Sequence, residues 1–302
     1  MGLLEAHAAL AGKRAVILGG AGGVGRAVTL GLAAAGIDVV VCDNDQDAGA
    51  TIAPDVEALG RRILYAACDV RDAVALDGFF DRIEAEVGTI DILVNVAGGV
   101  KSNRFLDTTR EQNANEIRLN YGYILDSVRR AVPLIRKGGK GGSIVSFTTI
   151  EAHRGAASYA VYAGAKAATT NFSRALAVEL AAEGIRVNII APDTTPSRTS
   201  SASADPAYIA RYMALPAEAR KQGMEMYIPQ KHPPSQEDLA NAVLFLVSDL
   251  ARSITGIVLH VDGGTMASAG FIEWPFEELG FGPAPRVGAL ERLFGGAGNS
   301  RG

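Results

Sequence analysis

The chain has 302 residues, of which 48% are hydrophobic and 21% charged, and its formal net charge is −4. These values are typical of a globular protein with a sizeable core. No run of Lys and Arg could neutralise a nucleic-acid backbone, and the longest charge-free runs, of eleven residues, are too short to span a bilayer. We therefore expect neither a nucleic-acid partner nor a membrane span.

The sequence predicts a cytoplasmic protein without a metal. Its first residues lack a basic leader followed by an apolar core, so no secretion signal is expected. The two cysteines, Cys42 and Cys68, have no CxxC spacing and are interpreted as reduced, buried thiols. None of the four histidines has a partner at ligand spacing, and we expect structural or surface roles for His7, His153, His232 and His260.

Short runs rich in β-branched residues alternate along the chain with longer Ala- and Leu-rich stretches of helical periodicity. The expected strands are Ala15–Leu18, Val39–Cys42, Ile63–Ala66, Ile92–Val94, Ser143–Phe147, Val187–Ile190 and Ile257–Val261. The expected helices include Arg26–Ala35, Ala73–Val87, Ile117–Arg136, Tyr159–Glu183 and Glu237–Leu250. Continuous apolar strands between helices favour a parallel sheet covered on both faces. The pattern predicts one doubly wound α/β domain of the Rossmann type, with seven parallel strands, over residues 1–264.

Two segments depart from this alternation. Residues 193–234 are rich in Pro, Ser and Thr around an amphipathic patch, Tyr208–Met226, and we expect a long, partly helical substrate loop. Residues 265–302 form an expected C-terminal extension that is punctuated by Gly and Pro. Its aromatic residues predict that part of it packs, over the active-site mouth or on a neighbouring subunit; they are Phe271, Trp274, Phe276, Phe281 and Phe294.

A glycine-rich turn, 19–25, follows the first expected strand and precedes a helix. Glycines let the backbone approach a pyrophosphate, and the helix N-terminus offers N–H groups and the positive end of its dipole. Asp43 stands eighteen residues past Gly25, at the end of the second strand, where a carboxylate can accept both ribose hydroxyls and repel a 2′-phosphate. The glycine segment could instead be a plain tight turn, and Asp43 could instead be a solvated residue at the end of a strand. Because no Lys or Arg stands at Asn44 or inside the turn, NAD is favoured over NADP.

Tyr162 and Lys166 are four residues apart in an expected helix, which puts them on one face. The phenol of a tyrosine has an ordinary pKa of about 10, too high for acid–base work near neutrality. A nearby ammonium and the positively charged nicotinamide ring would both lower that pKa and make Tyr162 a workable general acid or base. This spacing alone also arises by chance in helices.

Several further motifs stand in a fixed order around this pair, and with them the chain resembles the short-chain dehydrogenase/reductase family over about residues 11–264. The matching segments are Gly19-x3-Gly23-x-Gly25, Asp69-Val70, Asn95-Val96-Ala97-Gly98, Leu119-Asn120, 142–149, Arg186-Val187-Asn188, Pro192, Thr255-Gly256 and Val261-Asp262-Gly263-Gly264.

The resemblance implies a catalytic set and a cofactor-binding set. Tyr162 would exchange a proton with the substrate oxygen, Lys166 would bind the nicotinamide ribose and lower the pKa of the tyrosine, and Asn120 would support a water chain. Thr149, thirteen residues before Tyr162, would donate a hydrogen bond to the substrate oxygen. The implied cofactor contacts are Gly19, Gly23, Val24, Gly25, Asp43, Asp69, Val70, Asn95, Ala97, Tyr162, Lys166, Pro192 and Thr195.

Three positions depart from the family pattern. Leu18 replaces a Thr before the glycine turn, and Thr149 replaces a Ser, which keeps the hydroxyl and adds a methyl group. Asp193 replaces a Gly after Pro192, near the expected nicotinamide. Its carboxylate would either attract the oxidised ring or turn outward.

The expected function is NAD-dependent transfer of a hydride to or from a secondary alcohol or ketone. Aromatic, Met and Leu residues of the loop suggest a hydrophobic steroid-, terpenoid- or aryl-type substrate, although they could equally serve loop packing; they are Tyr208, Tyr212, Met213, Leu215, Met224, Met226 and Tyr227. A catalytically silent NAD-binding sensor or scaffold on the same fold is the main alternative. Family members mostly assemble as tetramers, so a homotetramer is expected through the helices around Asn120 and Tyr162 and through a second interface near the last strand.

Overall fold

The computed structural model describes residues 3–196, 206–274 and 281–283. Seven parallel strands form one sheet in the order β3-β2-β1-β4-β5-β6-β7. They are β1 Arg14–Leu18, β2 Asp38–Asp43, β3 Ile63–Ala67, β4 Ile92–Asn95, β5 Gly142–Phe147, β6 Ile185–Pro192 and β7 Val258–Val261. The order reverses between β1 and β4, as in a doubly wound Rossmann fold, so the predicted fold class is confirmed.

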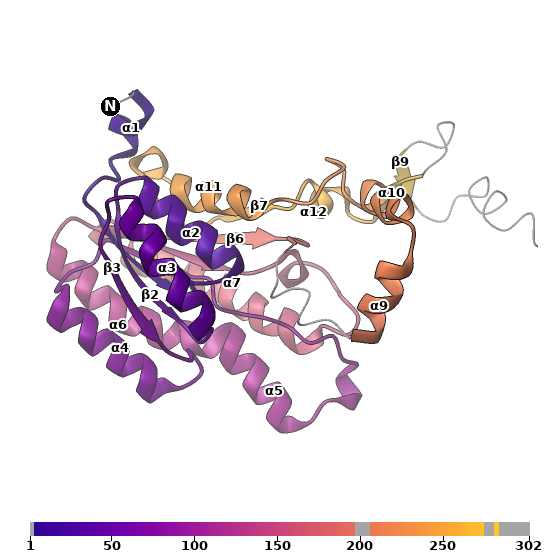
Figure 1. The fold of residues 1–302 in the computed structure, drawn as a ribbon, viewed down its shortest axis with the longest axis horizontal. Helices are drawn as coiled ribbons and strands as arrows, with labels where there is room; N and C mark the ends of the chain where they lie inside the picture. Colours follow the sequence, from indigo (N-terminus) through magenta and orange to yellow (C-terminus); the bar gives the residue numbers. More distant parts are fainter. Residues whose placement is uncertain (1–2, 197–205, 275–280, 284–302) are drawn as a thin grey trace, which may run out of the picture.

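Helices cover both faces of the sheet (Figure 1). One layer holds α2 Gly23–Ala34, α3 Gln46–Ala58 and α11 Gln236–Val247, and the other holds α4 Ala73–Glu86, α6 Tyr123–Gly138 and α7 Ala160–Leu180. α1 Leu3–Ala8 precedes the first strand, and α5 Arg110–Ile117 precedes α6. Because the inner strands are buried on both sides, they read as continuous apolar runs in the sequence.

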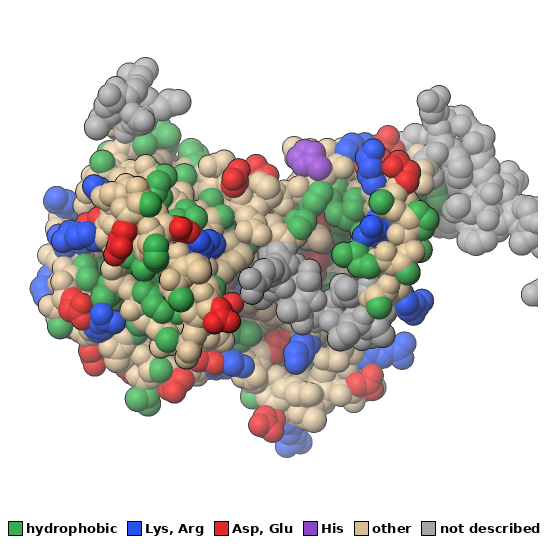
Figure 2. Space-filling view, viewed as in Figure 1, with side chains coloured by type: hydrophobic (Ala, Val, Ile, Leu, Met, Phe, Trp, Pro, Cys, Tyr) green, Lys and Arg blue, Asp and Glu red, His purple; other side chains and the backbone are tan. Residues whose placement is uncertain are grey.

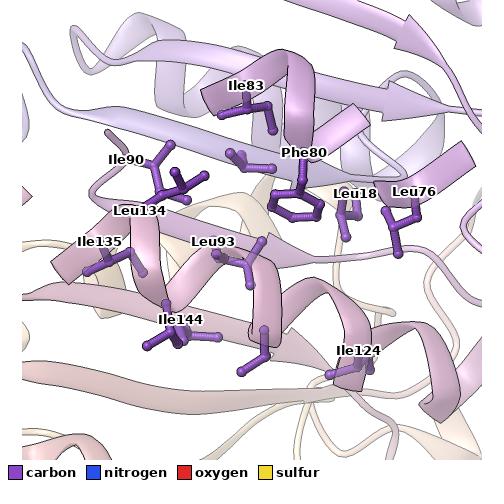
Figure 3. Packing of buried hydrophobic residues seen from close by; sticks show 14 of the residues in the cluster. Leu18, Leu76, Phe80, Ile83, Ile90, Leu93, Ile124, Leu134, Ile135 and Ile144 are labelled. Atoms are coloured by element: carbon purple, nitrogen blue, oxygen red, sulfur yellow. The ribbon is translucent and has the colours of Figure 1, made fainter. Parts of the chain in front are cut away.

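Each face of the sheet has its own hydrophobic core. The cluster beneath α4, α6 and α7 is drawn in Figure 3, where Phe80, Leu93 and Ile144 meet between helix and sheet. Leu18 belongs to this cluster and is fully buried. The departure from the family's Thr therefore adds apolar contact to the core, in which burial of a Leu side chain contributes about 2 kcal/mol.

The structure differs from the sequence expectation at two helices. α3 was not among the expected helices; it begins at Asp45, whose side chain accepts a hydrogen bond from Ala48 N–H, and it contains Pro54. The single helix expected over Ile117–Arg136 is divided by a π-helical turn, Arg118–Gly122, with α5 before it and α6 after it. The wider turn lets Asn120 O accept a hydrogen bond at 3.0 Å from the Thr169 hydroxyl of α7.

The substrate loop contains two helices, α9 Pro206–Ala214 and α10 Ala217–Tyr227. They lie beyond the carboxyl end of the sheet, at the end of the molecule away from α1 (Figure 1). A short α12, Thr265–Ser268, follows β7 and forms the start of the extension.

In the extension, β8 Phe271–Glu273 pairs with β9 Phe281–Pro283 and contacts α10. Trp274 is buried and Lys231 forms an ion pair with Glu273, so this part of the extension packs against the substrate-loop side of the same chain. Phe276 and Phe294 lie outside the described residues.

Acidic and basic side chains are interspersed over the face shown in Figure 2. Within residues 3–196, 206–274 and 281–283, no helix combines the length and apolarity that a bilayer crossing requires.

Candidate active site

The glycine turn closes the carboxyl end of β1 against the end of β4. Gly19 has a φ of +80°, which favours glycine, and a Cβ on it would lie 2.7 Å from Ala97 N. A Cβ on Gly25 would lie 1.7 Å from Gly19 O, so the turn leaves no space for a side chain there. Gly23 and Val24 form the first turn of α2, whose N–H groups have no helical partners. This cradle, at the point where the strand order reverses, fits a dinucleotide pyrophosphate.

Asp43 ends β2 beside this turn. Its Oδ2 accepts a hydrogen bond from Ala21 N–H at 2.9 Å, and its Oδ1 accepts one from Asp45 N–H at 3.0 Å. The carboxylate therefore holds the glycine turn against β2. Each carboxylate oxygen has a further lone pair, so Asp43 can also accept the hydroxyls of a ribose seated on the turn.

The other expected adenine-side residues are divided between surface and core. Asp69 pairs with Arg71, which lowers the pKa of its carboxyl, and Val70 is buried. Asn95 is fully buried, where its Nδ2 donates to Ser146 Oγ and its Oδ1 accepts from Ser127 Oγ. The side chain of Asn95 thus joins β4 to its neighbours, while Ala97, two residues later, lies against the glycine turn.

The structure places Thr149, and not Thr148, beside Tyr162. Thr148 points toward β6, with its hydroxyl 3.4 Å from Ile190 O. Thr149 lies two residues after the end of β5 and caps a short 3₁₀ turn, Ile150–Ala152, and its side chain contacts that of Tyr162. The hydroxyl thirteen residues before the tyrosine therefore has the position that the sequence resemblance implied.

Burial raises the pKa of Tyr162 above its ordinary value. The contact with the Thr149 side chain lowers this pKa, whereas the carboxylates of Glu151 and Glu116 raise it further. The family resemblance implied that Lys166 lowers the pKa of the tyrosine. In the structure without a cofactor, burial outweighs every group that favours the phenolate.

Lys166 is 3% exposed, and its burial lowers the pKa of its ammonium to about 8. Its Nζ donates to Phe147 O at 2.9 Å, at the end of β5. A Cβ on Gly98 would lie 3.0 Å from both this Nζ and Asn120 Oδ1, so the Lys166 and Asn120 side chains meet at the segment after β4. Asn120 is fully buried and is fixed by bonds to Gly99 N–H and Gly99 O.

Asp193 turns inward. Its Oδ2 is buried; burial raises the pKa of the nearby Tyr227 hydroxyl, and the Asp193 carboxylate raises it further. It follows Pro192, the last residue of β6, and Thr195 donates to Asp193 O at 3.4 Å. In the structure the Asp193 carboxylate lies beside Tyr227 of the substrate loop.

Sequence reasoning missed three polar residues near Tyr162 and Thr149, namely Glu151, Arg154 and Glu116, and it named Tyr227 only as a candidate apolar residue of the substrate loop. Glu151 and Arg154 follow β5, Glu116 ends α5, and Tyr227 ends α10. The spacing of Glu151 and Arg154, three residues apart in a polar stretch directly after Thr149, was a signal for the first pair. Nothing local in the sequence indicates that Glu116 would join them.

Two histidines predicted to be structural or surface residues pack together. The rings of His153 and His260 are 5.2 Å apart, and burial together with the charge of His260 lowers the pKa of His153. Within the part of the chain that the structure describes, no group of His, Cys, Asp and Glu side chains could hold a metal ion.

The family profile described as "Enoyl-(Acyl carrier protein) reductase" matches residues 19–266. The chain is 35% identical to 2,3-dihydro-2,3-dihydroxybenzoate dehydrogenase of Bacillus subtilis, covering 84% of this chain and 95% of the relative. It is 30% identical to 7alpha-hydroxysteroid dehydrogenase of Escherichia coli, covering 84% and 94%. Among solved structures, carveol dehydrogenase of Mycobacterium avium in complex with NAD is similar, with a TM-score of 0.77, 30% identity, and coverage of 85% and 98%.

The Rossmann sheet, the glycine turn at its switch point and the Tyr162–Lys166 pair define a class of nucleotide-dependent oxidoreductase. With these relatives, the chain belongs to the short-chain dehydrogenase/reductase family, and its activity is NAD(P)-dependent oxidoreduction.

Proposed function

We propose that this protein oxidises a secondary alcohol or reduces the corresponding ketone with NAD, using Tyr162 as general acid or base. The observation that carries the proposal is the contact of the Tyr162 hydroxyl with Thr149, beside a buried Lys166. A proton donor and a second hydroxyl thereby face the place that a substrate oxygen would occupy, at the carboxyl end of the sheet.

Each side chain has a defined task in this proposal. Bound NAD supplies the hydride acceptor or, when reduced, the hydride donor. Tyr162 accepts the proton of the alcohol during oxidation and donates a proton to the ketone oxygen during reduction. Thr149 forms a hydrogen bond with the substrate oxygen. Lys166 binds the nicotinamide ribose, and Asn120 supports the water chain through which protons reach the site.

Asp43 supports NAD over NADP, because its carboxylate lies beside the glycine turn and would repel a 2′-phosphate. The complex of the similar carveol dehydrogenase with NAD agrees with this preference. We expect kcat/KM to favour NAD by at least about tenfold, or roughly 1.4 kcal/mol. The variant Asp43→Ala should narrow that ratio, and equal use of both cofactors by the wild type would refute the assignment.

A hydrophobic alcohol or ketone of the steroid, terpenoid or aryl type is the proposed substrate class. Met213 and Leu215 of the substrate loop are exposed, so they are available to an apolar ligand. Relatives named for a hydroxysteroid, for carveol and for a dihydroxybenzoate support the same class.

The remaining proposals concern setting and assembly. The two cysteines are free and buried, which fits a cytoplasmic enzyme. Exposed apolar side chains on and before α5 and on α7 support a homotetramer built through these helices; they are Phe105, Leu106, Ile117 and Val178.

One activity screen distinguishes an enzyme from the alternative, a catalytically silent NAD-binding sensor. The purified protein is mixed with NAD or NADP and a panel of secondary alcohols, and reduced nicotinamide is followed by absorbance. The proposal predicts turnover with at least one cyclic, apolar alcohol. Tight NAD binding without turnover across the panel, in either direction, would favour the sensor.

A further inference from the structure

The hydroxyl of Thr149 contacts both Glu151 and Tyr162. A threonine hydroxyl carries one hydrogen and two lone pairs. Its hydrogen is directed to Oε2 of Glu151, and one lone pair faces Glu151 N–H across 3.4 Å. The remaining contact is with Tyr162. Glu151 therefore holds the same hydroxyl that faces Tyr162.

The second carboxylate oxygen of Glu151 is also hydrogen-bonded. Its Oε1 accepts a hydrogen bond at 2.9 Å from Nη2 of Arg154, and the same Nη2 donates to the Tyr227 hydroxyl at 2.7 Å. The guanidinium also lies 5.9 Å from the centre of the Tyr227 ring. With only 17% of the Glu151 side chain and 34% of that of Arg154 exposed, this ion pair is shielded from water far more than an ordinary surface pair.

We propose that Glu151 is a positioning residue of the active site, which orients the Thr149 hydroxyl and, with its charge balanced by Arg154, sets the ease with which Tyr162 gives up its proton. The inference rests on the proposed function, because it assigns a role in the same site.

The charges around Tyr162 determine whether replacement of Glu151 or Arg154 raises or lowers the pKa of Tyr162. Glu151 and Thr149 face it from the turn after β5, Glu116 faces it from α5, and Tyr159 and Lys166 lie on its own helix. The carboxylate of Glu151 raises the pKa of Tyr162. Removal of that carboxylate should therefore lower this pKa. Removal of the Arg154 charge should raise it, because Glu151 then loses its counter-ion.

Two variants test the proposal through the pH dependence of alcohol oxidation at saturating NAD. Glu151→Gln preserves the shape of the side chain, and Arg154→Met preserves its length, while each removes the charge. Since oxidation needs Tyr162 as the phenolate, the acid limb of kcat/KM follows its pKa. We expect the limb to move about half a pH unit or more to lower pH in Glu151→Gln and to higher pH in Arg154→Met.

Glu183→Gln is the matched control. Glu183 is also paired with an arginine, Arg136, but it lies beyond the other end of α7 from Tyr162. Its replacement should leave the limb where it is in the wild type. If Glu151→Gln and Arg154→Met lose turnover without moving the limb, or move it in the same direction, Glu151 has only a structural role and the proposal is wrong.

A readout without turnover separates this inference from the proposed function. Tyrosinate absorbance of the NAD-saturated protein is titrated in wild type and in Glu151→Gln, each against its Tyr162→Phe counterpart. A lower pKa of Tyr162 in Glu151→Gln supports the inference even if the alcohol panel shows no turnover, in which case the proposed function alone fails. An unchanged pKa would overturn the role of the Glu151 charge, whatever the enzyme turns over.

Discussion

At the scale of single residues, the site depends on which way one hydroxyl points. Thr148 and Thr149 are adjacent in sequence, and alternation of side chains across a strand sends them to opposite sides. The sequence predicted Thr149 from its spacing to Tyr162, and the structure shows Thr148 turned to Ile190 instead. Glu151 was not predicted, because its role depends on the turn after β5, where no strand or helix periodicity applies.

Replacement of Thr149 tests this register. Thr149→Val keeps the shape but removes the hydroxyl, and loss of one such hydrogen-bonding group typically reduces kcat by a factor of about 10² to 10³. Thr149→Ser should retain turnover within a few-fold, and the NAD dissociation constant should change little in both variants. Steady-state kinetics check this. If Thr148→Val abolishes turnover and Thr149→Val does not, the assignment of the catalytic hydroxyl is wrong by one residue.

The burial of Lys166 predicts how the free energy of unfolding of the cofactor-free protein depends on pH. Its pKa is about 8 in the folded protein and about 10.4 in an unfolded chain, so below pH 8 the buried ammonium destabilises the fold. Lys166→Met should raise the free energy of unfolding by about 2 kcal/mol at pH 7. Between pH 8 and 10.4 the unfolded state binds more protons than the folded state, so the wild type gains stability with pH and the difference should shrink.

Urea unfolding at pH 7 and at pH 10 measures that difference. Lys140→Met, at an exposed lysine, is the control and should have little effect at either pH. A Lys166→Met variant that is less stable than the wild type at pH 7, or equally stabilised at both values, would show that burial does not disfavour the ammonium.

At the scale of elements, the seven strands were predictable because parallel strands buried on both faces are continuous apolar runs. α3 was not predicted, since Pro54 and exposed polar residues interrupt its helical pattern, although Asp45 gives it an ordinary N-cap. The π-helical turn around Asn120 was also missed. Its stability comes from tertiary contacts, such as the bond from Thr169, that no local propensity expresses.

The contact between the C-terminal extension and α10 predicts that removal of the extension weakens substrate binding. A chain truncated after Gly270 loses β8, which contacts α10, together with the buried side chain of Trp274. Because α10 carries Tyr227, we expect KM for the alcohol to rise several-fold while the NAD dissociation constant stays near its wild-type value. Kinetics and cofactor titration measure both quantities.

Glu273→Gln is the control for the truncation. It removes only the half-exposed ion pair with Lys231, which contributes at most about 1 kcal/mol. A truncated chain that no longer binds NAD would show instead that the extension is needed by the Rossmann domain itself.

At the scale of the whole molecule, the proposed tetramer requires partners for apolar side chains that one chain leaves exposed. Val178 on α7 is 80% exposed, and Val74 on α4 is 81% exposed. If α5 and α7 form an interface, Val178→Arg should lower the mass measured by light scattering, whereas Val74→Arg should leave it unchanged. A wild-type protein that is monomeric at micromolar concentration would contradict the proposed assembly.

The central claim is that Tyr162 is the acid–base residue of an NAD-dependent dehydrogenase, and one comparison tests it most directly. Tyr162→Phe removes only the hydroxyl in contact with Thr149. We predict that the alcohol oxidation found in the panel falls by a factor of at least about 10³, while NAD binds with a dissociation constant within a few-fold of the wild type. Turnover by Tyr162→Phe that remains within tenfold of the wild type would contradict the claim.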